Sequence, residues 1–289
     1  MAEIQWFPGH MAKTGRELME TAKLADLVFE VVDARIPKSS SNPDFGKIFS
    51  GRNRIIILNK MDLADPSRSE KWERYYRNAG FKAFLTNAQR GDGIARIRAL
   101  LNGAGAEKTG RQANRGVISR PVRAIVAGIP NCGKSSIINS LIAKSIAKTG
   151  DRPGITRTQQ WIRLGDGIEL LDTPGVLWPK FIGGETALHL AFTGAIRDEV
   201  YDKIEAAEKL LVLLCERYMP LVAARYGDIG ARGDDTPRRG GEDYPLLEKA
   251  AKKRGFLLKG GRVDYDRTAA IVLDEFRAAK LGLITLEEP

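Results

Sequence analysis

Two short stretches decide the fold: residues 59–62 read NKMD, and residues 128–136 read GIPNCGKSS. The second satisfies the phosphate-loop pattern G-x-x-x-x-G-K-[ST], with a strand-like run before it and a helical pattern after it. The first follows another strand-like run and ends in an aspartate. In an ordinary P-loop domain the phosphate loop follows the opening strand, so the order of the two stretches is inverted here. Either one match is accidental or the chain is rewired.

Apolar runs of strand length alternate with helical patterns over the first part of the chain. We expect strands at 27–32, 55–58, 83–85, 122–127, 160–164 and 168–171, and helices at 67–78, 94–101 and 134–143. This alternation predicts an α/β fold with a doubly wound, mostly parallel sheet. Ligands bind at the carboxyl ends of the strands in such sheets, so both stretches are expected at one edge.

The character of the sequence changes to purely helical patterns after about residue 180. We therefore predict an α/β domain over 1–180, followed by a small all-helical domain over 181–289 that binds RNA or the ribosome. Within the first domain, 1–25 forms an N-terminal segment, and the Gly- and Arg-rich stretch 102–121 is predicted to be a linker.

The phosphate loop carries the groups that nucleotide phosphates need. Its glycines let the backbone wrap closely around the phosphates. The amides of the turn and of the helix N-terminus then point at their negative charge. Lys134 is expected to hold the β- and γ-phosphates, and Ser135 to give its hydroxyl to Mg²⁺. The expected phosphate contacts are Asn131, Cys132, Gly133, Lys134, Ser135 and Ser136. The alternative is a glycine-rich turn with a surface lysine.

The motif DTPG at 172–175 ends another strand-like run. Asp172 is placed to hold Mg²⁺ through water, and Gly175 can turn its amide toward the γ-phosphate. The motif alone is also a common turn, but it follows the phosphate loop by one β-hairpin. Thr156 or Thr158 can supply a second hydroxyl to Mg²⁺, and we expect Thr156.

NKMD discriminates between nucleotides. The carboxylate of Asp62 can accept two hydrogen bonds from the ring N–H and exocyclic amine of guanine, a pair that adenine lacks; such sites reject the wrong base by roughly 10⁴ or more. Asn59 and Lys60 are expected to brace the base and the phosphate loop. Asn87 and Ala88 of TNA, after the next strand, fit a backbone contact to the base. The alternative for NKMD is a strand-end turn closed by a helix cap.

The two stretches need not compete, because the order NKMD, TNA, GIPNCGKSS, GDRPGIT, DTPG is a circular permutation of the GTPase order. A doubly wound domain has neighbouring termini, so it can be cut elsewhere and keep its sheet. With WFPGHMAK (6–13), DARIP (33–37) and DTPGVLWPK (172–180), the sequence resembles the circularly permuted GTPases of the ribosome biogenesis GTPase A family. The resemblance implies hydrolysis of GTP to GDP with Mg²⁺, late maturation of the large ribosomal subunit, and binding to ribosomal RNA (rRNA).

The resemblance also suggests how water is activated. Position 176, where many GTPases keep a water-orienting glutamine, holds Val176. In the family the histidine of the FPGHM motif has that role, which falls on His10; a histidine beside Trp6 and Phe7 is otherwise more often structural. Lys134 is the second expected catalytic residue. Asn131 matches the asparagine that helps to coordinate K⁺ in potassium-activated GTPases, and a simple turn-forming asparagine is the alternative.

Charge and composition limit the classes of partner that we expect. The formal net charge is +10, which attracts polyanions, although a basic solvated surface is also possible on charge alone. No run approaches the ~18 apolar residues of a membrane span, no secretory signal is visible, and two cysteines cannot form a disulfide framework. We expect a cytoplasmic protein without a membrane partner, monomeric away from the ribosome, with an organellar relative as an alternative. The basic clusters that could touch rRNA include 13–16, 111–123, 238–239 and 249–262.

The sequence thus predicts a GTP-hydrolysing assembly factor that binds immature large subunits in its GTP state and leaves on hydrolysis. Two alternatives stay open. One is an RNA-binding protein that holds guanine nucleotide with little turnover. The other is a P-loop small-molecule kinase, which NKMD argues against.

Overall fold

The computed structural model describes residues 9–113, 120–149, 161–165, 167–173, 175, 177, 184–230 and 244–289. The chain divides into two compact units. The first, called the GTP-site unit below, lies within Phe7–Lys180 and also includes Glu287–Pro289. The second, the helical unit, lies within Phe181–Leu286. Each unit is described by itself.

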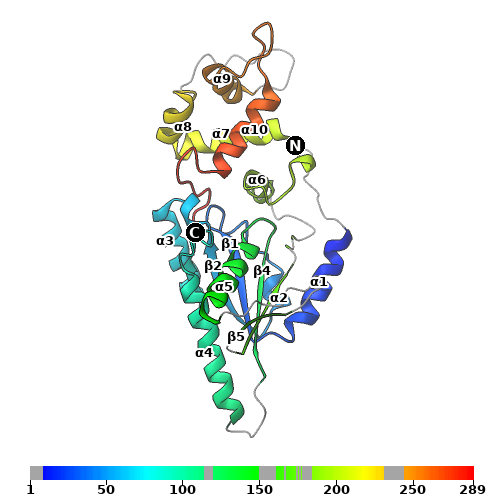
Figure 1. Ribbon diagram of the computed structural model, residues 1–289. Helices are drawn as coiled ribbons and strands as arrows, with labels where there is room; N and C mark the ends of the chain where they lie inside the picture. Colours follow the sequence, from blue (N-terminus) through cyan, green and yellow to red (C-terminus); the bar gives the residue numbers. More distant parts are fainter. Residues whose placement is uncertain are drawn as a thin grey trace. The chain divides into compact units, whose positions relative to one another are not determined.

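A single six-stranded sheet forms the centre of the first unit (Figure 1). Its strands are β1 Leu27–Asp33, β2 Asn53–Asn59, β3 Lys82–Leu85, β4 Val122–Gly128, β5 Ile162–Gly165 and β6 Ile168–Asp172. They lie in the order β3-β2-β1-β4-β6-β5, and all neighbours are parallel except β5 and β6. The predicted doubly wound, mostly parallel sheet is therefore confirmed.

The strand order explains how a permuted chain makes an ordinary sheet. β1 lies between β2 and β4, with Asp33 opposite Asn59 and Val31 opposite Gly128. The carboxyl ends of β1, β2 and β4 consequently meet at one edge, which is where the sequence places both decisive motifs. A chain that began at β4 and closed back from β6 to β1 would keep every strand pair.

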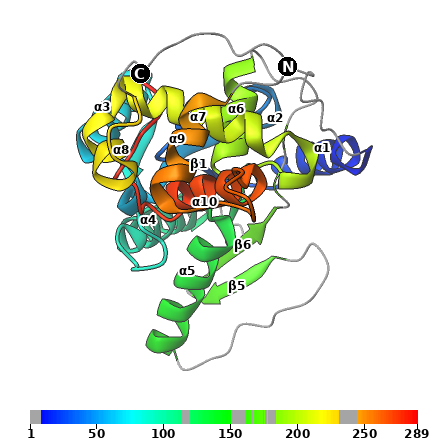
Figure 2. The same cartoon turned by 90° about the horizontal axis from the view of Figure 1, so that it is seen from above.

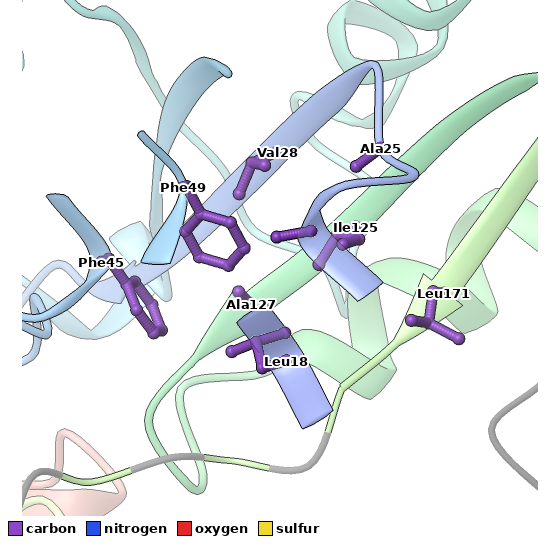
Figure 3. Close-up of a cluster of buried hydrophobic side chains, with 9 residues drawn as sticks. Leu18, Ala25, Val28, Phe45, Phe49, Ile125, Ala127 and Leu171 are labelled. Atoms are coloured by element: carbon purple, nitrogen blue, oxygen red, sulfur yellow. The ribbon is translucent and has the colours of Figure 1, made fainter. Parts of the chain in front are cut away.

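Helices cover both faces of this sheet. α1 (Gly9–Ala22), α2 (Phe45–Ile48) and α3 (Pro66–Asn78) lie on one face, and α4 (Ile94–Ala113) and α5 (Lys134–Thr149) on the other. Figure 3 shows how α1 and α2 are fixed: Leu18, Phe45 and Phe49 point toward Val28 of β1 and Ala127 of β4. All seven residues of β1 are buried, because both faces of the sheet are covered, and the strand is apolar apart from Glu30 and the final Asp33.

The predicted linker over 102–121 is wrong for residues 102–113, because α4 continues through Ala113. The stretch contains Gly103 and Gly105, but Ala, Glu, Lys and Gln around them favour the helix. Gly105 sits against β4, where an added Cβ would lie 3.8 Å from the Val122 side chain. Lys108 of α4 contacts residues beside β1 and β4, with its Nζ 2.6 Å from the Asp26 carboxylate and 2.9 Å from the Pro121 carbonyl oxygen.

The helical unit is built around α7 (Lys203–Arg217), which contacts α6 (Gly184–Phe192), α8 (Met219–Tyr226), α9 (Pro245–Arg254) and α10 (Tyr265–Arg277). Figure 2 shows these helices from above, and it also shows β5 and β6 beside α5 in the first unit. Among the described residues, no helix is long and apolar enough to span a bilayer.

Candidate nucleotide-binding site

Asn59, the last residue of β2, ties three loops together. Its Nδ2 donates to the Cys132 carbonyl oxygen in the phosphate loop at 2.9 Å. Its Oδ1 accepts from the hydroxyl of Thr86 and from the backbone N–H of Ala88, both at 3.2 Å. The side chain is buried, so each of its bonds replaces one to water. NKMD, TNA and the phosphate loop therefore meet at a single amide.

Lys60 extends this junction. Its backbone adopts the left-handed conformation (φ 62°), which aims the side chain back across the sheet edge. The Nζ donates to the Asn131 carbonyl oxygen and lies 3.0 Å from the Asp33 carboxylate at the end of β1. Asp33 also pairs with Arg35 at 2.7 Å, and both of these side chains are 2% exposed. The lysine thus connects the strand-end carboxylate to the phosphate loop.

The ionised state of Asp33 is fixed by this arrangement. Burial by itself would raise the pKa of Asp33. The positive charges of Arg35 and Lys60 and the hydrogen bonds from Arg35 outweigh burial, so the pKa lies well below the usual aspartate range. Asp33 is consequently a fixed negative charge around which Lys60 is positioned.

Asp62 lies in a short 3₁₀ turn directly after Lys60, and its side chain is exposed. The turn is held by the Met61 N–H, which donates to the Thr86 carbonyl oxygen at 3.1 Å. A carboxylate that is exposed at this edge can meet a base from solvent, as the guanine hypothesis requires.

The loop after β3 is braced from within. The Asn87 Oδ1 accepts from the backbone N–H groups of Gln89 and Arg90, both at 3.1 Å, and thereby closes its own turn. The Ala88 N–H points to Asn59, while its carbonyl oxygen accepts from Ser140 of α5 at 2.6 Å. Both residues shape the edge, and direct contact between them and a base stays a prediction.

Three glycines allow the loops of the site to approach one another. A Cβ on Gly128 would lie 2.4 Å from the Val31 carbonyl oxygen, and one on Gly175 would lie 2.6 Å from the backbone nitrogen of Pro130. Gly133 has φ 97°, and a Cβ there would lie 2.2 Å from the Asn59 Nδ2. DTPG and NKMD are therefore packed directly against the backbone of the phosphate loop.

Replacing Gly133 by alanine is expected to weaken nucleotide binding. The new methyl group must displace Asn59 and adopt a strained backbone conformation, at a cost of about 1–3 kcal/mol. Titration with GDP is expected to show a loss of affinity of about tenfold or more, and thermal unfolding a lower midpoint. Gly51→Ala is a matched control, since that glycine also has positive φ (72°) but an added Cβ would meet nothing within 4 Å. Equal GDP affinity in the two variants would contradict the close approach.

Lys134, Ser135 and Asp172 are the residues predicted to hold the phosphates and the metal. Lys134 is buried, and its Nζ donates to the Ile129 carbonyl oxygen of its own loop at 2.8 Å. The Ser135 hydroxyl donates to Asp172 Oδ2 at 3.2 Å. Ser136 follows in the first turn of α5, whose N–H groups are available for anions. Burial raises the pKa of the Cys132 thiol, which therefore stays protonated beside them.

The environment of Asp172 fits a divalent cation. Burial raises the pKa of this carboxyl group, and the charge of Lys134 and the hydrogen bond from Ser135 offset burial only in part. Its Oδ1 is buried and has no hydrogen-bond partner. A Mg²⁺ ion at Ser135 and Asp172 would satisfy that oxygen and favour the ionised carboxylate.

Some predicted site residues are not described in full. His10 lies in the first turn of α1, but its side chain is outside the described part of the chain, as are Thr156, Thr158 and Val176. Within the described residues, no group of three or more His, Cys, Asp or Glu side chains could hold a metal by itself.

Sequence reasoning missed the bracing roles of Asp33, Arg35 and Thr86. The DARIP motif containing the first two was part of the family resemblance, but its spacing alone gave no chemistry. For Asp33 and its partner Arg35, the signal that could have found them is a carboxylate at the end of a buried, mostly apolar strand, since such a carboxylate has to be paired.

A phosphate loop after β4, joined through Asn59 to NKMD after β2, defines a circularly permuted P-loop GTPase. Ribosome biogenesis GTPase A of Priestia megaterium is 44% identical over 287 residues, covering 99% of this chain and 97% of the relative. The chain belongs to the ribosome biogenesis GTPase A family and is accordingly an enzyme that hydrolyses GTP.

Two more distant relatives also bear the names of ribosome-related GTPases. Ribosome biogenesis GTPase A of Thermotoga maritima is 30% identical over 99% of this chain and 95% of its own length. Mitochondrial ribosome-associated GTPase 1 of Bos taurus is 31% identical, over 98% of this chain and 88% of its own length. A family model described as 50S ribosome-binding GTPase matches residues 123–225.

Solved structures show the same fold over nearly the whole chain. GDP-bound TM YlqF has a TM-score of 0.68 at 28% identity, covering 95% of this chain and 99% of that one. GNP-bound YlqF from Thermotoga maritima has a TM-score of 0.65 at 28% identity, covering 96% and 98%. The predicted family and fold class are thereby confirmed.

Proposed function

We propose that this chain is a GTP-driven assembly factor for the large ribosomal subunit. It binds immature subunits and their rRNA in the GTP state and is released when GTP is hydrolysed. The observation that carries the proposal is the Asn59 junction, because it joins a guanine-type tetrapeptide to a complete phosphate loop. The names of the relatives, with ribosome biogenesis in one and ribosome association in another, and the 50S description of the family model support the partner.

The site residues are assigned as follows. Asp62 binds the guanine base, with Asn59 and Lys60 bracing it and Asn87 and Ala88 shaping the neighbouring loop. The phosphates lie on the loop amides and Lys134, and Gly175 brings the DTPG backbone to the same place. The loop contacts are Asn131, Cys132, Gly133, Ser135 and Ser136. Mg²⁺ is held by Ser135, Thr156 and Asp172, and supplies positive charge against the phosphates when bound.

Hydrolysis is proposed to be slow until the protein docks. An apolar side chain at position 176 cannot orient a water molecule, so the general base comes from His10 or from the partner. Potassium at Asn131 would offset developing charge beside the phosphates, as an arginine finger does. Asn131 has the left-handed backbone (φ 58°) that turns the loop around such a position.

A basic surface in the helical unit suits rRNA. After α9, a turn closed by the Leu258 N–H and the Arg262 carbonyl oxygen at 2.8 Å carries exposed Lys259 and Arg262. Lys253 at the end of α9 is exposed as well. Lysine and arginine side chains of this kind contact phosphates without reading sequence. Within the predicted cluster 249–262, Lys249 and Arg254 are engaged inside the unit, by Ile229 and Glu275.

The two alternatives make different demands on the same site. A small-molecule kinase would tolerate ATP, whereas the exposed carboxylate of Asp62 selects a base with two donors. A protein that merely holds GDP would use the same metal-site groups at Ser135 and Asp172 but would not turn GTP over. Competition among nucleotides separates the first alternative, and turnover on the ribosome separates the second.

Co-sedimentation with large ribosomal subunits tests the proposal. We expect binding with a non-hydrolysable GTP analogue, little binding with GDP, and a rise in GTPase rate of about tenfold or more in the same tubes, equivalent to about 1.4 kcal/mol of barrier. Small subunits serve as the control. Equal sedimentation with both nucleotides, or rapid hydrolysis by the protein alone, would contradict the release mechanism.

A further inference from the structure

The last residues of the chain are built into the GTP-site unit. The Glu287 carboxylate accepts from the backbone N–H of Lys38 at 2.6 Å, from that of Ser39 at 3.0 Å, and from the Ser39 hydroxyl. The Glu287 carbonyl oxygen accepts from the indole N–H of the fully buried Trp72 at 3.1 Å. Glu287 is buried, with 7% of its surface exposed, and these contacts come from residues 38–39 and from α3.

The turn that Glu287 holds leads directly into the site. Ser40, the next residue, accepts from the Asp33 N–H at 2.9 Å and donates to the Ile36 carbonyl oxygen at 2.7 Å. Asp33 in turn holds Lys60, which donates to Asn131. The Glu287 side chain is therefore linked to the phosphate loop through the turn at 38–40, the buried Asp33 and the partly exposed Lys60.

The other end of the tail is bound inside the helical unit. The Leu286 carbonyl oxygen accepts from Arg217 of α7. The Thr285 carbonyl oxygen accepts from the Tyr218 hydroxyl at 3.0 Å, and the Thr285 N–H donates to the same hydroxyl oxygen at 3.1 Å. Thr285 and Leu286 are thus held within the helical unit, whereas Glu287 belongs to the GTP-site unit.

We propose that Glu287 is a positioning residue for guanine nucleotide binding. Its carboxylate fixes the turn after β1, the turn fixes Asp33, and Asp33 holds Lys60 against the phosphate loop. The proposal rests on the assignment of Lys60 to the nucleotide site. A carboxylate is required because two backbone N–H groups and a hydroxyl converge on one side chain, and an ionised acceptor satisfies all three most strongly.

The test uses the full chain and a fluorescent GDP analogue. Glu287→Ala is expected to lower affinity about tenfold by speeding dissociation, and Glu287→Gln to fall between it and the wild type. Glu288→Gln is the matched control, because the neighbouring carboxylate is half exposed and its ion pair with Arg68, at 3.1 Å, lies away from the turn at 38–39. The control is expected to bind GDP as the wild type does.

If Glu287 only stabilised the fold, its loss would lower stability without acting on GDP affinity through Lys60. A double-mutant cycle separates this structural role from the positioning role. In a Lys60→Ala background, Glu287→Ala is expected to change GDP affinity less than about twofold, because its path is already cut. Fully additive losses would overturn the proposal, as would unchanged affinity in Glu287→Ala. If that variant does not fold, Ser39→Ala removes one of the three donors and is expected to give a smaller loss with the same dependence on Lys60.

The experiments distinguish a wrong assignment of the nucleotide site from a wrong role for Glu287. If Asp62→Asn leaves base selectivity unchanged, the nucleotide site itself is misassigned. If Asp62→Asn alters selectivity while Glu287→Ala binds GDP normally, only the positioning role is overturned.

Discussion

Replacing Asp62 by asparagine is expected to change which base the protein binds. The carboxylate accepts from both guanine donors, whereas an asparagine amide offers one acceptor and one donor. The amide –NH₂ then faces the guanine exocyclic amine, so two donors meet and one hydrogen bond is lost. We expect affinity for GDP to fall by a factor of about 10²–10⁴ relative to the wild type.

The same substitution is expected to favour xanthine nucleotides. Xanthine has a carbonyl oxygen where guanine has the amine, so the asparagine –NH₂ gains an acceptor while its oxygen still meets the ring N–H. Competition of GDP and xanthosine diphosphate against a fluorescent nucleotide measures the change. Asp65→Asn is a suitable control, because Asp65 caps α3 three residues further along. A parallel loss of affinity for both nucleotides in Asp62→Asn would show that the residue has a structural role only.

Replacing Asp33 by asparagine is expected to cost about 3–5 kcal/mol of unfolding free energy. Its removal leaves Arg35, whose side chain is 2% exposed, as a buried charge without its nearest carboxylate. Denaturant unfolding of wild type and variant measures the loss. Glu20→Gln is the control, since the Glu20–Lys23 pair is exposed on both sides and such pairs contribute about 0–1 kcal/mol. An Asp33 variant as stable as this control would contradict the buried pair.

The same residue sets an acid sensitivity. The pKa of Asp33 is lower in the folded state than in the unfolded chain, so the folded protein binds fewer protons over that interval. Its contribution to stability is therefore present above the usual aspartate pKa of about 3.9 and is lost as the pH falls toward the folded-state value. The stability difference between wild type and Asp33→Asn is expected to shrink over that acidic interval. A difference that grew toward low pH would contradict this sign.

Much of the fold could be predicted from the sequence because the decisive signals are local. A strand, a glycine-rich turn and a helix around GIPNCGKSS lie within one short stretch, and NKMD likewise follows its own strand. Since parallel strands bring their carboxyl ends to one edge, two local patterns were enough to place both motifs together.

The errors and omissions have physical causes as well. Gly103 and Gly105 made 102–121 look like a linker, but the packing of α4 on β4 outweighs their low helix propensity. The sequence suggested a backbone contact of Asn87 with the base, and it gave no sign that the side-chain amide closes its own turn. The contacts of Glu287 join residues far apart in the chain, which no local pattern can reveal.

A structure of the protein with Mg²⁺ and a non-hydrolysable GTP analogue tests the central claim most directly: that the two inverted motifs make one guanine nucleotide site. We expect both Asp62 carboxylate oxygens within hydrogen-bond distance of the guanine ring N–H and amine. The phosphates should lie on the Asn131–Ser136 amides, with the metal between Ser135 and the Asp172 oxygen that now lacks a partner. A nucleotide bound at the phosphate loop with its base away from residues 59–62 would contradict the claim.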